Sequence, residues 1–169
     1  MTYKKILIPI FLCVLHLSTC KASNSSETNH TLPQLSLLDW DGNEIAFQDF
    51  KGKILIVDVW ATWCSPCKKS VPVLEELIDS SDSDYSFIGI NTDTDIGPEM
   101  VRKKALEWKM SYPSLIDPHH IFLDYFKIEG LPAFLVFSKN GNLIYQQLGI
   151  KETDLDGLKV RMASWKSLE

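Results

Sequence analysis

Cys64 and Cys67 are the residues of this sequence best suited to chemistry. They bracket a Cys-Ser-Pro-Cys segment, whereas the other two cysteines, Cys13 and Cys20, lie in an apolar N-terminal stretch. Side chains three positions apart are neighbours on a helix, which brings two sulfurs within reach of a disulfide. A pair of this kind is either a redox-active dithiol or one half of a metal site.

The segment after the cysteines has the periodicity of an amphipathic helix. Its apolar positions are Val71, Leu74, Leu77 and Ile78. A helix that begins here places Cys64 beside unpaired N–H groups and the positive end of the helix dipole, which should lower the pKa of its thiol. We predict that Cys64 is exposed and attacks as a thiolate, and that Cys67, one turn inward, resolves the mixed disulfide.

The residues next to the sulfurs are predicted to contact the substrate. Pro66 lacks a backbone N–H and suits the first turn of a helix, whereas Ser65 adds no charge to the cysteine pair. Together with Trp63, these two residues form the predicted substrate-binding set around the dithiol.

Asp58 interrupts an apolar, β-branched run at residues 54–59, which is typical of a strand buried on both faces. A buried carboxylate is unfavourable without a partner, and loss of hydration raises its pKa into the range of a proton acceptor. We predict that Asp58 is the base for Cys67, acting through a water molecule. The alternative is a hydrogen-bonded structural aspartate.

Strand and helix patterns alternate along the remaining chain. A second apolar run lies at residues 87–90, and Gly97-Pro98 opens a second helical pattern. Asn140-Gly141 between two apolar runs indicates a hairpin, and a turn-rich interval at residues 39–43 indicates another near the N-terminus. The predicted fold is α/β, with a mixed central sheet, helices on both faces and an N-terminal β-hairpin.

The N-terminus has the layout of an export signal. Two lysines precede an apolar run of about twelve residues, which is too short to span a bilayer as a helix. We predict a signal peptide at residues 1–20, a flexible tether at 21–31 and one folded domain at 32–169. Cys20 follows Leu-Ser-Thr in a pattern like a bacterial lipobox, so it is the candidate lipidation site and membrane contact. The alternative is an ordinary secretory signal, and both place the protein outside the cytoplasm.

The charge of the chain argues against a nucleic-acid-binding protein, and its few candidate ligands argue against a zinc-binding protein. Seventeen basic residues against 22 acidic ones give a net charge of −5, without a basic run that could bind nucleic acid. A zinc site would need a second pair of ligands, for which Asp117, His119 and His120 are the only candidates, and we expect the histidines to be solvated. No metal and no cofactor other than the Cys64–Cys67 dithiol is predicted.

Residues 60–68 read Trp-Ala-Thr-Trp-Cys-Ser-Pro-Cys-Lys, which resembles the thioredoxin superfamily and its TlpA/ResA branch. Gly52-Lys53, the long interval at 91–117 and Gly130-Leu131-Pro132 follow in family order. The resemblance implies a thioredoxin-like fold and a thiol-disulfide oxidoreductase that reduces exported proteins. It also implies apocytochromes c as one substrate class and a membrane electron donor of the DsbD or CcdA type.

The same resemblance assigns a role to Pro132. It implies a cis peptide bond facing the disulfide, with Leu131 offering backbone groups to an extended substrate, whereas the alternative is an ordinary trans turn proline. This chain departs from the branch at two positions. Ser70 stands where some relatives have an acidic residue, and Asp58 stands where many have asparagine.

Two other activities use similar folds. Copper chaperones of the Sco type bind metal through cysteines separated by three residues plus a distant histidine, whereas the separation here is two. Thiol peroxidases of the redoxin type carry Thr or Ser three residues before the reactive cysteine and Pro four residues earlier. Ala61 and Val57 occupy those positions, which disfavours a peroxidase.

Overall fold

The computed structural model describes residues 31–168. The strands are β1 (Ser36–Asp39), β2 (Glu44–Ala46), β3 (Ile54–Trp60), β4 (Tyr85–Asn91), β5 (Ser114–Ile116), β6 (Ala133–Phe137) and β7 (Leu143–Leu148). The helices are α1 (Ser65–Asp79), α2 (Pro98–Glu107), α3 (Ile121–Phe126) and α4 (Leu155–Trp165), with 3-10 turns η1 (Phe47–Phe50) and η2 (Glu152–Asp154).

In this part of the chain the seven strands form one mixed sheet in the order β2-β1-β5-β4-β3-β6-β7. Strands β3, β4 and β5 run parallel, because helices α1 and α2 connect them, whereas β6 and β7 pair antiparallel through the turn at Gly141. β1 pairs antiparallel with both β2 and β5. The central β3 therefore has a partner on each side.

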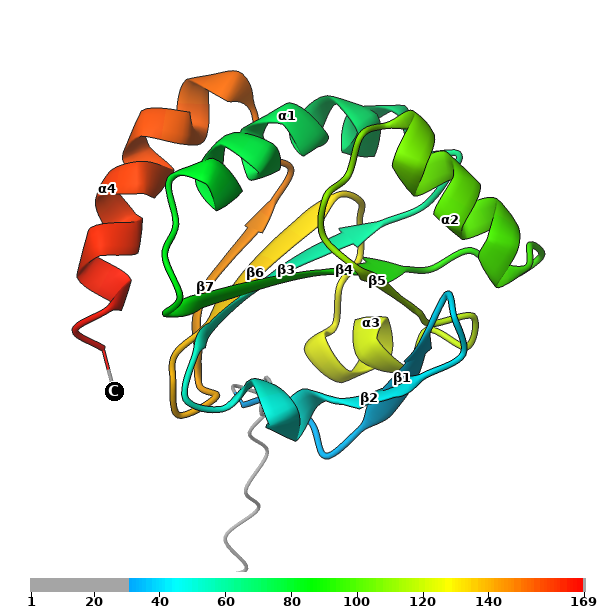
Figure 1. Ribbon diagram of the computed structural model, residues 1–169, viewed down its shortest axis with the longest axis horizontal. Helices are drawn as coiled ribbons and strands as arrows, with labels where there is room; N and C mark the ends of the chain where they lie inside the picture. The colour runs from blue at the N-terminus through cyan, green and yellow to red at the C-terminus, as the bar shows by residue number, and fades with distance from the viewer. Residues whose placement is uncertain (1–30, 169) are drawn as a thin grey trace, which may run out of the picture.

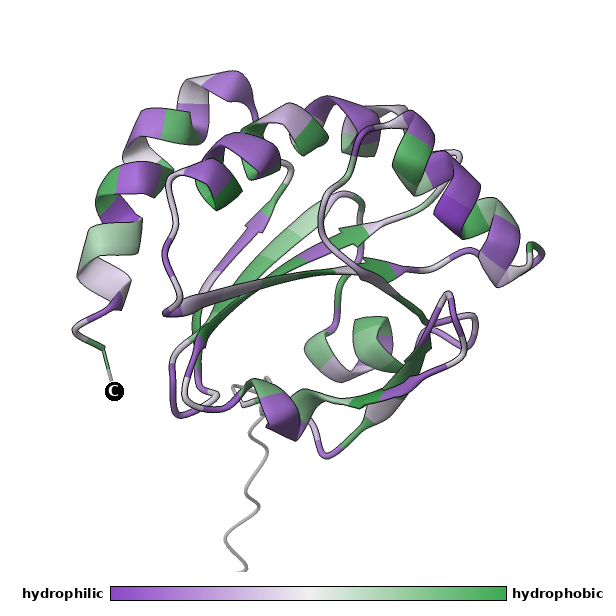
Figure 2. Ribbon diagram, viewed as in Figure 1, coloured by the Kyte–Doolittle hydropathy of each residue, from purple (hydrophilic) through white to green (hydrophobic). Residues whose placement is uncertain are grey.

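Helices cover both faces of the sheet, as predicted. α1, α2 and α4 lie on one face, and α3 and η1 lie on the other (Figure 1). Alternate residues of β3 point to the two sides: Ile56 and Trp60 join the cluster under α1, whereas Val57 and Val59 join the cluster under α3. Figure 2 shows hydrophobic colour along the central strands and hydrophilic colour on the outward sides of α1 and α4.

The first described residue, which was predicted to belong to the tether, contacts the folded domain. Thr31, assigned to the tether, forms a bridge with Asn142, and the Leu32 N–H donates to the Gly141 carbonyl. The predicted signal peptide and Cys20 lie outside the described residues. None of the helices in residues 31–168 combines the length and the apolar character that a membrane-spanning helix needs.

Candidate active site

Cys64 and Cys67 form a disulfide at the start of α1, with 5.2 Å between their Cα atoms. Cys64 is the N-cap residue of this helix, and the Cys67 backbone N–H donates to Cys64 Sγ at 3.1 Å. Pro66 lies in the first turn, where a missing N–H leaves no bond unmade. After reduction, the same N–H would stabilise a thiolate at Cys64 in preference to the thiol.

The predicted exposure of Cys64 is wrong for this disulfide form. Only 3% of Cys64 is exposed and Cys67 is fully buried, because both pack in the apolar cluster under α1. The neighbours reach solvent instead: Ser65 and Pro66 are exposed, and Trp63 is 73% exposed. Any partner must therefore first meet the residues around the disulfide.

Asp58 is buried on the face of the sheet that α1 covers. Its Oδ2 accepts a hydrogen bond from the Tyr112 hydroxyl at 2.9 Å, and its Oδ1 has no partner among the described residues. Burial raises the pKa of Asp58 to about 7, and the bond from Tyr112 opposes that rise. Such a carboxyl can take up or release a proton near neutrality, and both the base and the structural interpretation remain compatible with it.

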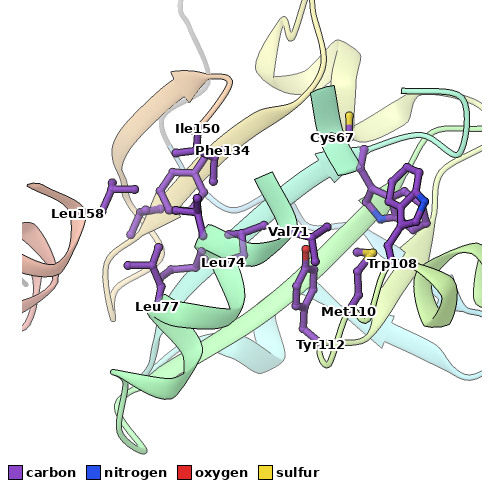
Figure 3. Close-up of a cluster of buried hydrophobic side chains, with 14 of the residues drawn as sticks. Cys67, Val71, Leu74, Leu77, Trp108, Met110, Tyr112, Phe134, Ile150 and Leu158 are labelled. Atoms are coloured by element: carbon purple, nitrogen blue, oxygen red, sulfur yellow. The ribbon is translucent and has the colours of Figure 1, made fainter. Parts of the chain in front are cut away.

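Tyr112 is a residue that sequence reasoning missed. It lies between α2 and β5, 54 positions from Asp58, and is buried with Met110, Val71 and Cys67 in one cluster (Figure 3). A single aromatic residue between a predicted helix and strand is typical of ordinary core packing. The sequence gives no signal for the pair, because 54 positions separate the hydroxyl from the predicted buried carboxylate.

A buried polar network, also missed, holds the loop that leads to Cys64. Both the backbone N–H and the hydroxyl of Thr62 donate to the Asp93 carboxylate, at 2.8 and 3.1 Å. Asn91, at the end of β4, donates a third hydrogen bond to the same carboxylate at 2.8 Å. The parallel neighbour of β3 therefore fixes the loop from which α1 starts.

The Leu131–Pro132 peptide bond is cis. Pro132 is buried, whereas Leu131 is partly exposed and lines a hollow of about 320 Å³ together with Trp63. Two predicted substrate-binding residues, far apart in sequence, thus share one surface beside the cysteines. Their contact with substrate stays a prediction.

Two of the three residues considered as metal ligands have hydrogen-bond partners, whereas His119 is exposed, as predicted. Both oxygens of Asp117 accept backbone N–H groups at the start of α3. His120 is not solvated as predicted: it is partly buried, and its Nε2 lies 3.0 Å from the Thr92 carbonyl oxygen. Ser70, at the position where some relatives are acidic, is buried and donates to the Cys67 carbonyl.

The comparisons with known proteins agree with this geometry. A family model described as Redoxin matches residues 27–160. The chain belongs to the redoxin family. It is 26% identical over 152 residues to the thiol-disulfide oxidoreductase ResA of Bacillus thuringiensis subsp. konkukian, a match that covers 86% of each protein.

One further relative and one solved structure resemble this chain. The thioredoxin-like protein YneN of Bacillus subtilis is 30% identical over 110 residues, which is 64% of each protein, so the match spans just under two thirds of that relative. A solved structure of a DsbE-type thiol:disulfide interchange protein from Chlorobium tepidum superposes with a TM-score of 0.73 at 19% identity, covering 82% of this chain and 97% of that one. The fold is thioredoxin-like, and this redoxin-family chain is of the TlpA/ResA type. Its dithiol centre is that of a thiol-disulfide oxidoreductase.

Proposed function

We propose that this protein reduces disulfides in exported proteins through the Cys64–Cys67 dithiol. The observation that carries the proposal is the position of Cys64 as N-cap of α1, with the Cys67 N–H aimed at its sulfur. That arrangement favours a thiolate at the first cysteine and holds the second within bonding distance.

The exchange has two steps. The Cys64 thiolate attacks one sulfur of the substrate disulfide, which forms a mixed disulfide and releases one substrate thiolate. Cys67 then loses its proton to Asp58 and attacks Cys64 Sγ, which forms the Cys64–Cys67 disulfide and releases the second substrate thiolate. The substrate gains two electrons, and the dithiol loses two.

Trp63, Ser65, Pro66, Leu131 and Pro132 are the proposed docking residues. Trp63 and Leu131 line the same hollow, and Ser65 and Pro66 are exposed beside the buried sulfurs. An extended chain lying here would bring its own sulfur to Cys64 and could pair with the backbone of Leu131.

The proposed location is extracytoplasmic, after cleavage of residues 1–20 or with a lipid on Cys20. Apocytochromes c are one proposed substrate class. A membrane carrier of the DsbD or CcdA type is the proposed electron donor, because a dithiol that reduces substrates must itself be reduced again in each cycle.

The peroxidase alternative is disfavoured by the residues before Cys64. Ala61 offers no hydroxyl, and the hydroxyl of Thr62 donates to Asp93. The copper-chaperone alternative would require a distant histidine to approach the cysteines, whereas His120 contacts Thr92.

The redox state of Cys64 and Cys67 in living cells tests the proposal. Cells with and without the membrane donor are acid-quenched, alkylated with a thiol reagent that adds mass, and compared on non-reducing gels. We expect the reduced pair in cells with the donor and the disulfide in cells without it. A disulfide in both strains would make the protein a net oxidant instead.

A further inference from the structure

Tyr112 provides the only hydrogen bond that the described residues make to the buried carboxylate of Asp58. The two residues come from different parts of the chain, Asp58 from the central strand β3 and Tyr112 from the segment before β5. Both are buried, with 2% of Asp58 and 4% of Tyr112 exposed. Water therefore cannot easily replace this contact.

The contact makes the two oxygens of Asp58 unequal. Oδ2 accepts the Tyr112 hydroxyl at 2.9 Å, whereas Oδ1 accepts no hydrogen bond from residues 31–168. A carboxylate held through one oxygen cannot rotate without breaking that bond. Oδ1 is thus the oxygen available to take a proton.

The surroundings of Tyr112 keep its hydroxyl protonated, so that it donates the hydrogen bond to Asp58. Burial and the neighbouring Asp58 raise the pKa of the Tyr112 hydroxyl well above its ordinary value, so the hydroxyl keeps its proton at neutral pH. Glu75, on α1, acts in the same direction. The strands on either side of Asp58 place Gly89 and Phe134 opposite it, and neither of these carries a titratable group.

Cys67 packs in the same cluster as Tyr112, and it is the thiol that must lose a proton before it can resolve the mixed disulfide. Figure 3 shows it at the start of α1, above the side chains of Val71 and Tyr112. We propose that Tyr112 is a positioning residue, whose hydroxyl fixes Asp58 so that Oδ1 receives the proton of Cys67 during resolution of the mixed disulfide. This inference rests on the proposed function. It adds to that function a residue that determines the pH range in which Cys67 can resolve the mixed disulfide.

The direction of the effect follows from the bond itself. A hydrogen bond donated to a carboxylate favours the charged form and lowers its pKa. With Tyr112 present, a larger fraction of Asp58 is ionised at neutral pH and can accept a proton. Without the hydroxyl, burial acts unopposed and resolution should need a higher pH.

The test is Tyr112→Phe, which removes one oxygen and keeps the ring. The reduced full-length protein is mixed in a stopped-flow instrument with an equimolar aromatic disulfide, 5,5′-dithiobis(2-nitrobenzoate). The first coloured thiolate reports attack by Cys64, and the second reports resolution by Cys67. Both rates are measured from pH 5 to pH 9, and thermal unfolding verifies that each variant is folded.

We expect the first phase of Tyr112→Phe to be unchanged and the second to slow by about tenfold at pH 7, the effect of one hydrogen bond to a charged group. The acid limb of the second phase should move to higher pH. Tyr85→Phe is the matched control, because Tyr85 is also buried and donates to the Met162 carbonyl, away from the cysteines. Its profile should match wild type.

Asp58→Asn separates this inference from the proposed function. It should slow the second phase and abolish its acid limb, and adding Tyr112→Phe should slow it no further. The positioning role would be overturned if the pH profile of Tyr112→Phe matched that of wild type. It would also be overturned if Tyr112→Phe slowed the second phase by the same factor in the Asp58→Asn protein as in wild type. A wild-type profile for Asp58→Asn would overturn it as well, while the exchange itself stands. Absence of both phases in wild type would instead overturn the proposed function.

Discussion

At the scale of single residues, burial of Asp58 and of the two sulfurs determines the chemistry of the site, because burial changes the pKa of an ionisable group. Asp58 lies where a charge is unfavourable, and its pKa rises from 3.8 to about 7. The folded protein therefore holds a proton that the unfolded chain would release above pH 4. This difference makes folding stability depend on pH.

Asp58→Asn should make the protein more stable at neutral and alkaline pH. Because the pKa is raised in the folded state, the stability of the wild type falls as pH rises from about 4 and levels off above about 7. The difference between 3.8 and about 7 corresponds to a loss on the order of 4 kcal/mol. Urea unfolding of both proteins, with the disulfide intact, should give similar stability at pH 4 and a clear gain for the variant at pH 8.

The control for this comparison is Asp49→Asn, at an exposed aspartate in η1. Because this side chain is exposed, Asp49→Asn should not reproduce the gain in stability at pH 8 that is expected for Asp58→Asn. If Asp58→Asn behaves like this control, the buried carboxyl does not ionise as its surroundings imply.

The two cysteines should differ as traps for substrates. Cys67→Ser leaves the attacking thiolate without its resolving partner, so mixed disulfides should accumulate. Cys64→Ser should trap few, because Cys67 is fully buried and lacks the position at the helix start. Non-reducing gels and mass spectrometry of cell extracts would identify the trapped proteins, and equal trapping by both variants would contradict this division of roles.

At the scale of elements, a side-chain hydrogen bond between β3 and β5 passes over the strand that separates them. Trp60 Nε1 donates to Ser114 Oγ at 3.0 Å, although β4 lies between the strands that carry them. Gly89 of β4 makes this possible. A Cβ atom at Gly89 would lie 2.2 Å from Ser114 Oγ and 2.9 Å from Trp60 Nε1.

Gly89→Ala should therefore destabilise the protein by about 1–3 kcal/mol, the usual range for overpacking a tight core. It must displace the Trp60–Ser114 hydrogen bond, directly below the active-site loop. Gly157→Ala is the matched control, because Gly157 lies exposed in α4 with open space at its Cβ position. That variant should gain about 0.5–1 kcal/mol from helix propensity. Equal unfolding midpoints in urea for the two variants would contradict the packing argument.

At the scale of the whole molecule, the site lies at the end of the interior strand β3, in a sheet whose two faces are covered by helices (Figure 1). Trp63, in the β3–α1 loop, and Leu131, before the cis Pro132, border a hollow at the surface beside the buried sulfurs. A substrate protein must therefore bind this surface before its disulfide can reach Cys64. Where that encounter happens depends on the N-terminal segment, which carries the proposed export signal.

Cys20→Ser tests how the mature protein is held. If Cys20 is lipidated, wild type should incorporate a labelled fatty acid and partition with membranes, whereas the variant should lose the label and become soluble after export. Equal absence of label in both proteins would leave the ordinary secretory signal as the correct interpretation. The dithiol activity should be kept in either case, because the substitution does not change Cys64, Cys67 or any other residue of the active site.

The sequence by itself determined the features that depend on neighbours along the chain. The spacing of Cys64 and Cys67 and the helical pattern after them fix a disulfide at a helix start, because contacts between positions three apart follow from helix geometry. The apolar run around Asp58 likewise predicts its burial, since a strand so apolar on both faces must be central.

Only the tertiary structure decided which distant residues meet at the site. Tyr112 reaches Asp58, and Asp93 reaches Thr62, across 54 and 31 positions of sequence. The burial of Cys64 also depends on this packing, which is why its predicted exposure was wrong. Such contacts are set by strand order and register in the sheet, and a one-residue slip of register would turn these side chains to the opposite face.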